Sequence, residues 1–311
     1  MLRLVQTAST FIDLSHPLSR GTLGESFEQL LASIDPRAEP DCCSIDDDTT
    51  SNTVHARSRR LFFYRPHRFG NMSEELELAH RLQHALLPLG IPPGIPCKVT
   101  AVLESYCHLS GDVFGWSKSG EDEFRVWVMD MCGHGIRAGI MAAVVKLLMD
   151  DIDAHQSVAS MFIELNSRLS SCLTTTDDVL YATGVFLQIS SDSFSYASAA
   201  HPALLHRSGK GDVRVLPSSG LPLGVFDDSR YEILHHPLRT GDALLFCTDG
   251  VLEAGNSRED EFGLQRLISA FALAGTGSLS AAHAVFAAVA RHQDMNAIDD
   301  DITFVITEHT A

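Results

Sequence analysis

The chain has 311 residues, of which 45% are hydrophobic and 20% are charged, as expected for a globular protein with a core of ordinary size. The formal net charge is −17, which excludes the clustered basic surface that nucleic-acid-binding proteins need. We find no apolar stretch as long as a membrane span and no secretory signal pattern, and the seven cysteines lack zinc-site spacing. We therefore expect a cytoplasmic protein that has no nucleic-acid or membrane partner.

The first 70 residues carry the weakest structural signal. The stretch RAEPDCCSIDDDTTSNT is acidic and poor in apolar residues, which is typical of a loop or a disordered segment. The stretch RSRRLFFYRPHRFG is basic and aromatic, and it fits a short strand as well as a docking segment. We expect residues 1–70 to form an N-terminal extension that is partly disordered.

Residues 71–96 predict a helix followed by a Pro/Gly-rich linker. Asn71 is a candidate N-cap, Glu74 lies three residues on as in a capping box, and Pro88 ends the helix. A stripe with coiled-coil spacing runs along it: Met72, Leu76, Ala79, Gln83 and Leu86. The helix over 72–87 can pack on its own domain or pair with a second chain, and the sequence leaves both open.

From residue 97 to 311, strands and helices occur in separate runs. Strands are expected at 98–106, 123–130, 181–189, 193–199, 202–207, 212–217, 230–236, 242–248 and 302–309. Helices are expected at 135–153, 158–173, 262–274 and 279–293. This segregation predicts an α+β fold in which two packed sheets are flanked by helices.

Acidic residues stand at the ends of four predicted strands. They are Asp112 after 98–106, Asp130 at the end of 123–130, Asp249 after Ala243–Cys247, and Asp299, Asp300 and Asp301 before the closing strand. One such residue is usually a cap or a turn residue. Four sites, each beside glycine or further acids, predict a cluster.

Converging carboxylates raise one another's pKa and destabilise a fold unless a dication lies between them. Oxygen ligands favour hard ions such as Mg²⁺ and Mn²⁺. Two such ions about 3.5–4 Å apart activate a water for phosphate-ester hydrolysis without a protein nucleophile.

Eight motifs in this region resemble the SpoIIE/RsbU-type branch of the PPM (type 2C) bacterial protein serine/threonine phosphatases. They follow the family's order over about two thirds of the chain: SGDVFGW, VMDMCGHGIRAGIMA, YATGVFLQI, YASAAHPALLHR, GLPLGVF, LRTGDALLFCTDGVLEAGN, EFGLQRL and DDITFVIT. The stretch AHRLQHALLP resembles the linker helix that often precedes this domain.

The resemblance implies a PPM-type β-sandwich flanked by pairs of helices in residues 97–311, with two Mn²⁺ or Mg²⁺ ions at one end. The catalytic metal ligands that it implies are the side chains of Asp112, Asp130, Asp249 and Asp300 and the backbone carbonyl of Met131. The run of three acids leaves the register among Asp299, Asp300 and Asp301 open. Gly250 is expected to let the chain turn away after Asp249.

Two positions depart from the family pattern. Gly115 stands where many members carry a second acid, so we expect a modest effect on metal affinity or on a third metal site, without loss of activity. Ala200 replaces the glycine of a Gly-His-Pro motif, so this loop is expected to differ slightly, because a positive φ favours glycine.

Three further residues have two interpretations each. His134 is either a turn residue that packs under the following helix, which we favour, or a proton donor near the leaving oxygen. His201 is expected to be structural. Glu253 either supports the metal site or is an ordinary acid on the side of a helix.

The activity implied by the resemblance is metal-dependent hydrolysis of phosphoserine and phosphothreonine in a protein. The substrate is expected to be a phosphorylated anti-sigma-factor antagonist in a partner-switching signalling pathway. A catalytically silent pseudophosphatase that acts as a binding module is the main alternative, and a small-molecule metal phosphohydrolase is another. The helix over 72–87 is expected to mediate a homodimer or to recruit an activating partner.

Overall fold

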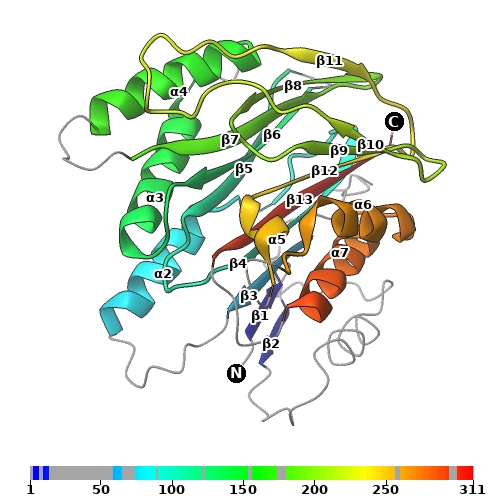
Figure 1. Cartoon of the computed structure of the whole chain (residues 1–311), viewed down its shortest axis with the longest axis horizontal. Coiled ribbons are helices and arrows are strands. Elements are labelled where there is room, and N and C mark those ends of the chain that lie inside the picture. Colours follow the sequence, from blue (N-terminus) through cyan, green and yellow to red (C-terminus); the bar gives the residue numbers. More distant parts are fainter. Residues whose placement is uncertain are drawn as a thin grey trace, which may run out of the picture.

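The computed structural model describes residues 3–6, 10–13, 59–64, 74–88, 90–120, 123–152, 156–173, 180–255, 260–293 and 300–310. Two packed sheets form its centre (Figure 1). In the eight-stranded sheet, the order is β10 (Val213–Leu216), β9 (Leu204–Arg207), β12 (Ala243–Cys247), β13 (Ile302–His309), β4 (Cys97–Glu104), β3 (Arg59–Tyr64), β1 (Arg3–Gln6) and β2 (Thr10–Asp13). In the five-stranded sheet, it is β11 (Leu234–Pro237), β8 (Ser193–Ala199), β7 (Ala182–Ile189), β6 (Phe124–Met131) and β5 (Asp112–Lys118). All neighbouring strands are antiparallel except β3 and β4.

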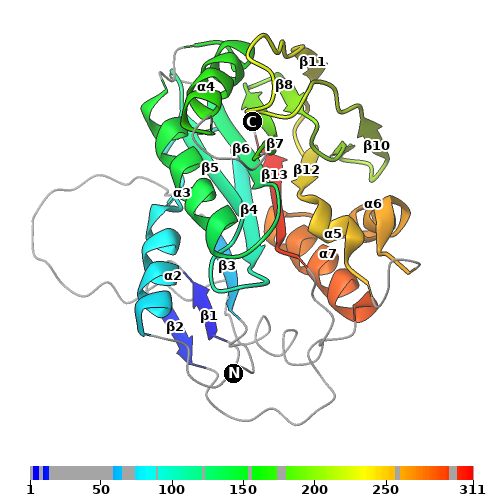
Figure 2. The same cartoon turned by 60° about the vertical axis from the view of Figure 1, so that its left-hand side comes forward.

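Helices cover the outer face of each sheet. Against the five-stranded sheet lie α3 (Ile136–Asp151) and α4 (Val158–Leu173), with α2 (Glu74–Leu86) beside α3 (Figures 1 and 2). Against the eight-stranded sheet lie α6 (Gly263–Leu273) and α7 (Ser278–His292), and the short α5 (Asp249–Glu253) follows β12. No helix in the described ranges combines the length and the apolarity that crossing a bilayer requires.

The sequence pattern explains this layering. Because both faces of the central strands are covered, β4, β6 and β13 are buried at nearly every position and not at alternate ones. One apolar cluster fills the space between the sheets and under α3 and α4, and a second lies between the eight-stranded sheet and α6 and α7. The predicted α+β sandwich flanked by pairs of helices is confirmed.

Several element predictions need correction. Asp112 does not simply follow the strand after residue 97: it begins β5, a strand that was not predicted. Asp249 begins α5, which was also not predicted, and β11 starts at Leu234, four residues later than expected. In the N-terminal region, Arg59–Tyr64 forms a strand, whereas Asn71 and Met72 lie outside the described residues.

Candidate metal centre

Strands β5 and β6 place two of the predicted ligands opposite each other. Asp112 at the start of β5 pairs directly with Asp130 near the end of β6. In an antiparallel pair, directly opposite residues point to the same face, with their Cβ atoms about 5 Å apart. The two carboxylates therefore face the same space at one end of the sandwich.

The other sheet contributes Asp249 and Asp300 to the same end. Strand β12 pairs with β13, and Thr248 N–H donates to the carbonyl of Thr303 at 2.9 Å, so Asp249 and Asp300 lie on neighbouring strand ends. A Cβ on Gly250 would lie 2.0 Å from the carbonyl oxygen of Asp301. Gly250 lies inside α5 and is required for this close approach, so the predicted turn at Gly250 is wrong.

Hydrogen bonds join the two sheets at this point. Thr248 Oγ1 donates to Asp112 Oδ2 at 2.8 Å, and both residues are buried. The carboxylate of Asp301 accepts one bond from Tyr106 N–H at 2.7 Å and another from Gly111 N–H at 2.6 Å. Asp301 thus fastens the loop that precedes Asp112, and both of its oxygens are already engaged.

This arrangement bears on the choice among the three consecutive acids. Asp300 is less buried than Asp301, and its Oδ1 accepts a bond from the N–H of Asp301 at 2.8 Å. Because Asp301 holds backbone groups, Asp300 is the better candidate ligand of the two. Asp299 lies outside the described residues.

The carboxylates raise one another's pKa. Burial, followed by the charges of Asp130 and Asp301, raises the pKa of Asp112 well above its usual range. Burial and the charges of Asp249, Asp300 and Asp301 raise the pKa of Asp130 to about 8. Burial also raises the pKa values of Asp249, Asp300 and Asp301. Ionising all of these carboxyl groups together is therefore costly in the metal-free fold.

A divalent cation fits this donor set. Within the described ranges, no three His, Cys, Asp or Glu side chains converge closely enough to hold an ion as they stand, so binding requires the carboxylates to draw together. All candidate ligand atoms are oxygens, which suit Mg²⁺ and Mn²⁺ and not zinc. A bound dication would also remove the repulsion that raises these pKa values.

The backbone around Met131 is tightly packed against the loop before Asp112. The N–H of Met131 donates to the carbonyl of Gly111 at 3.2 Å. A Cβ on Gly111 would lie 3.1 Å from the carbonyl oxygen of Gly133 and 3.3 Å from that of Met131. The Met131 carbonyl therefore lies beside the residue that precedes Asp112.

Both departures from the family pattern have local structural correlates. A Cβ on Gly115 would lie 2.3 Å from Cζ2 of Trp127, so the indole occupies the space that an acid would need. Ala200 has a φ of 51°, and it is the sole non-glycine residue with a positive φ in the described part of the chain. Alanine therefore stands in a backbone conformation that costs about 1–2 kcal/mol.

The two histidines differ in their surroundings. His201 is buried, its Nδ1 lies 3.0 Å from Thr183 Oγ1, and burial lowers its pKa to about 3. It is a neutral structural group next to the strand partner of Asp130. His134 does not pack under α3: its side chain is exposed, its ring lies edge-on to Tyr106, and its charge opposes the rise in the pKa of Asp300 that burial causes. Glu253 is exposed on α5.

The helix α2 packs on its own domain, one of the two possibilities that the sequence left open, and it holds the loop before Asp112. Gln83 Nε2 donates to the carbonyls of Ser110 at 2.7 Å and Gly139 at 3.0 Å, and Gln83 Oε1 accepts from Ser110 N–H at 3.0 Å. His80 Nδ1 lies 2.8 Å from the carbonyl of His108 in the same loop. Gln83 is a polar residue inside the apolar stripe of this helix, and it was the feature of the sequence that could have indicated this contact.

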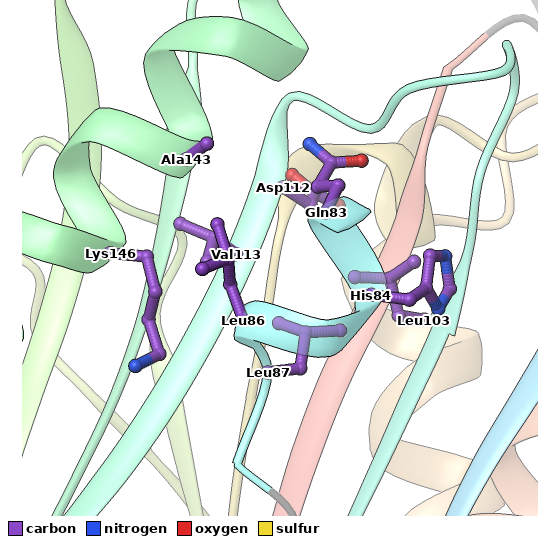
Figure 3. Close-up of a pocket in the computed structure, with 9 residues that line it drawn as sticks. All are labelled: Gln83, His84, Leu86, Leu87, Leu103, Asp112, Val113, Ala143 and Lys146. Carbon is purple, nitrogen blue, oxygen red and sulfur yellow. The ribbon is translucent and has the colours of Figure 1, made fainter. Parts of the chain in front are cut away.

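A small cavity of about 10 Å³ separates this helix from the aspartates (Figure 3). Its walls are Gln83, His84, Leu86 and Leu87 of α2, Leu103 of β4, Asp112 and Val113 of β5, and Ala143 and Lys146 of α3. The volume suffices for about one water molecule. The helix α2 therefore packs within a water diameter of a candidate ligand.

Comparison with known protein families shows to which family the chain belongs. The family described as Stage II sporulation protein E (SpoIIE) matches residues 120–310, which is more than half of the chain. The chain belongs to the SpoIIE family. The match begins after Asp112, although the pairing of β4 with β13 and of β5 with β6 makes these earlier strands part of the same sandwich.

Individual relatives agree with this assignment. The phosphoserine phosphatase RsbP of Bacillus subtilis (strain 168) is 26% identical over 187 residues, which cover 59% of this chain and 46% of RsbP. This SpoIIE-family chain therefore spans about half the length of that relative.

Solved structures share the fold. The SiaA-PP2C domain of Pseudomonas aeruginosa aligns with a TM-score of 0.64 and 19% identity, covering 76% of this chain and 96% of that domain. RsbX in complex with magnesium aligns with a TM-score of 0.52 and 18% identity, covering 68% of this chain and 96% of RsbX. The PP2C architecture of this SpoIIE-family chain is thus independently supported.

Proposed function

We propose that this protein is a metal-dependent protein serine/threonine phosphatase whose catalytic domain is residues 97–311. The observation that carries the proposal is the meeting of carboxylates from both sheets at one end of a SpoIIE-family sandwich, with their pKa values raised. A scaffold that only binds a partner has no need of such a costly cluster, which disfavours the pseudophosphatase alternative.

Two Mn²⁺ or Mg²⁺ ions would be held by the side chains of Asp112, Asp130, Asp249 and Asp300 and by the carbonyl of Met131. Such ions lower the pKa of a bound water and neutralise phosphoryl oxygens. RsbX, a protein of the same fold, is known in complex with magnesium, which supports the choice of a divalent cation.

The other residues of the site act on these ligands. The Thr248 hydroxyl donates to Asp112 and fixes the direction of its second oxygen. Asp301 holds the backbone N–H groups of Tyr106 and Gly111, so the loop before Asp112 keeps its position when the carboxylates draw together. His134 is exposed and close enough to Asp300 for its charge to act on that carboxyl group, so it can approach a substrate phosphate.

The substrate class proposed is a serine-phosphorylated anti-sigma-factor antagonist in a partner-switching pathway. Support comes from the name of RsbP, a phosphoserine phosphatase with 26% identity. We further propose that α2 mediates a homodimer or recruits an activating partner, because Leu78 and Leu82 on its outer side are 50% and 61% exposed while Gln83 holds the loop before Asp112. Light scattering on the full chain and on Leu82→Glu tests the dimer, and identical monomer masses for both would exclude it.

Hydrolysis of p-nitrophenyl phosphate with Mn²⁺, with Mg²⁺ and with EDTA tests the activity. Turnover that requires metal supports the phosphatase. If no metal gives turnover, calorimetric titration with Mn²⁺ separates a site that cannot bind metal, as in a pseudophosphatase, from one that binds metal and needs an activator.

A further inference from the structure

The segment between β10 and β11 exposes apolar side chains. Leu221, Val225 and Phe226 are 49%, 38% and 49% exposed, and Tyr181 at the start of β7 is 36% exposed. We call these four residues the rim patch. Single exposed apolar residues are ordinary on a protein surface, but several grouped on one short segment are typical of an interaction site.

The backbone that carries the rim patch is firmly held. The buried Asn166 of α4 donates from Nδ2 to the carbonyl of Phe226 at 2.8 Å and accepts from the N–H of Gly224 at 2.8 Å. Leu223 exchanges two backbone hydrogen bonds with Ala182, at 2.8 and 3.0 Å. Figure 1 shows the segment passing beside α4. A surface held in this way loses little conformational freedom when a partner binds.

The rim patch begins at the edge of the candidate metal centre. Met131 pairs with Ala182 across β6 and β7, and Ala182 forms a bridge with Leu223. Neighbouring strands lie about 4.8 Å apart, so the backbone of Leu223 is about 10 Å from that of Met131. The carbonyl of Tyr181 accepts from the N–H of Cys132 at 2.9 Å, which places Tyr181 next to the same loop.

We propose that the rim patch docks the folded body of the phosphoprotein substrate, through an apolar surface that lies beside its phosphoserine. This inference rests on the proposed phosphatase function. A specific protein interface covers about 800 Å² on each partner, equivalent to a disc about 16 Å in radius. The backbone of Leu223 lies within that radius of Met131, so a protein whose phosphoserine reaches the aspartates also approaches the segment that carries Leu221 and Val225. The aspartates act on the phosphate alone, and the rim patch recognises the protein that carries it.

The test compares three substrates of increasing size on the purified full chain. They are p-nitrophenyl phosphate, a phosphoserine peptide of about ten residues, and the intact serine-phosphorylated anti-sigma-factor antagonist from which the peptide is taken. For Leu221→Ser and Phe226→Ser, we expect kcat/KM for the intact protein to fall about tenfold each, through KM. We expect kcat/KM for the two small substrates to stay at the wild-type value.

A matched control is Leu273→Ser on α6, which removes an apolar side chain that is 88% exposed. All three substrates should be hydrolysed by this variant at wild-type rates. Val225→Ser provides a third rim variant if either of the others melts at a lower temperature than the wild type.

Unchanged kcat/KM for the intact phosphoprotein in the folded rim variants would overturn the docking surface and leave the phosphatase proposal standing. A dimer seen by light scattering that the rim variants dissociate would overturn it as well, because the occupant would then be a second copy. Wild-type protein that hydrolyses none of the three substrates with any metal, and that binds no Mn²⁺ in the calorimetric titration, would refute the phosphatase and this inference together.

Discussion

The two ends of β12 each carry a buried or partly buried aspartate, in opposite surroundings. Before the strand, Asp242 accepts hydrogen bonds from the N–H groups of Gly209 and Arg239, and its Oδ2 lies 3.0 Å from His206 Nε2. After the strand, burial raises the pKa of Asp249, and the charge of Asp249 in turn raises the pKa values of Asp130 and Asp300. A carboxylate surrounded by donors stabilises a loop, whereas one surrounded by carboxylates needs a cation.

Asp249→Asn is the substitution from which we expect the largest effect, a loss of activity at the end of β12 that carries the candidate ligand. The substitution keeps the shape of the side chain and removes one negative oxygen from the donor set. We expect metal-dependent hydrolysis of p-nitrophenyl phosphate to fall by about 10³-fold or more while the melting temperature of the metal-free protein is unchanged or higher. Retained turnover would show that the metal centre lies elsewhere.

Asp242→Ala should have the converse effect. It leaves the N–H groups of Gly209 and Arg239 and a ring nitrogen of His206 without their carboxylate partner, so we expect a loss of about 1–2 kcal/mol in the free energy of unfolding. Urea denaturation measures this loss. Activity per folded molecule should match the wild type. A selective loss of turnover would show that Asp242, like Asp249, serves the active site.

Metal binding should stabilise the protein in a pH-dependent way. The pKa of Asp130 is about 8 in the metal-free fold, above its usual 3.8, so its contribution to stability is present at low pH and is lost as pH rises through 8. Saturating Mn²⁺ relieves this loss, so we expect the melting temperature to rise by about 5–10 °C at pH 8.

At pH 5.5 the shift on adding Mn²⁺ should be smaller, because the metal must displace protons from the carboxylates. Differential scanning fluorimetry with and without Mn²⁺ at both pH values measures the difference. Equal shifts at the two pH values would contradict the proposed coupling, and Asp249→Asn serves as the control with reduced metal binding.

Ala200→Gly is the smallest predicted change. Ala200 has a φ of 51°, so glycine relieves backbone strain and loses more chain entropy on folding. We expect a net gain of about 0.5–1 kcal/mol in the free energy of unfolding, measured by urea denaturation, with no change in turnover. A loss of stability would mean that the methyl group contributes more by packing than it costs in strain.

The sequence predicted most of the sandwich because its central strands are apolar runs and its helices have three- and four-residue spacing. It missed β5, because Gly111 and Gly115 break the apolar pattern of SGDVFGW at the strand that Asp112 begins. Position alone does not separate Asp242 from Asp249, since both flank the same apolar strand and both lie beside glycine; it was the resemblance to the family that indicated Asp249. Their difference depends on donors and carboxylates that are far away in the chain.

The candidate ligands themselves remain predictions, although the structure brings Asp112, Asp130, Asp249 and Asp300 to one end. What the sequence could not indicate is the division of labour between Asp300 and Asp301. That division depends on the N–H groups of Tyr106 and Gly111, about 190 residues earlier in the chain. The rim patch was also missed, because its apolar residues lie in a loop without periodicity.

The central position of β13 has a consequence for how the protein is made. This strand lies between β12 and β4. The two residues just before it are Asp300 and Asp301, and Asp301 accepts the hydrogen bond from Gly111 N–H. During synthesis, β4, β5 and β6 emerge more than 170 residues before β13 can pair with β4. A nascent chain that has not reached residue 309 therefore lacks the complete strand that joins β12 to β4, so the eight-stranded sheet can close only when synthesis of this region is almost finished.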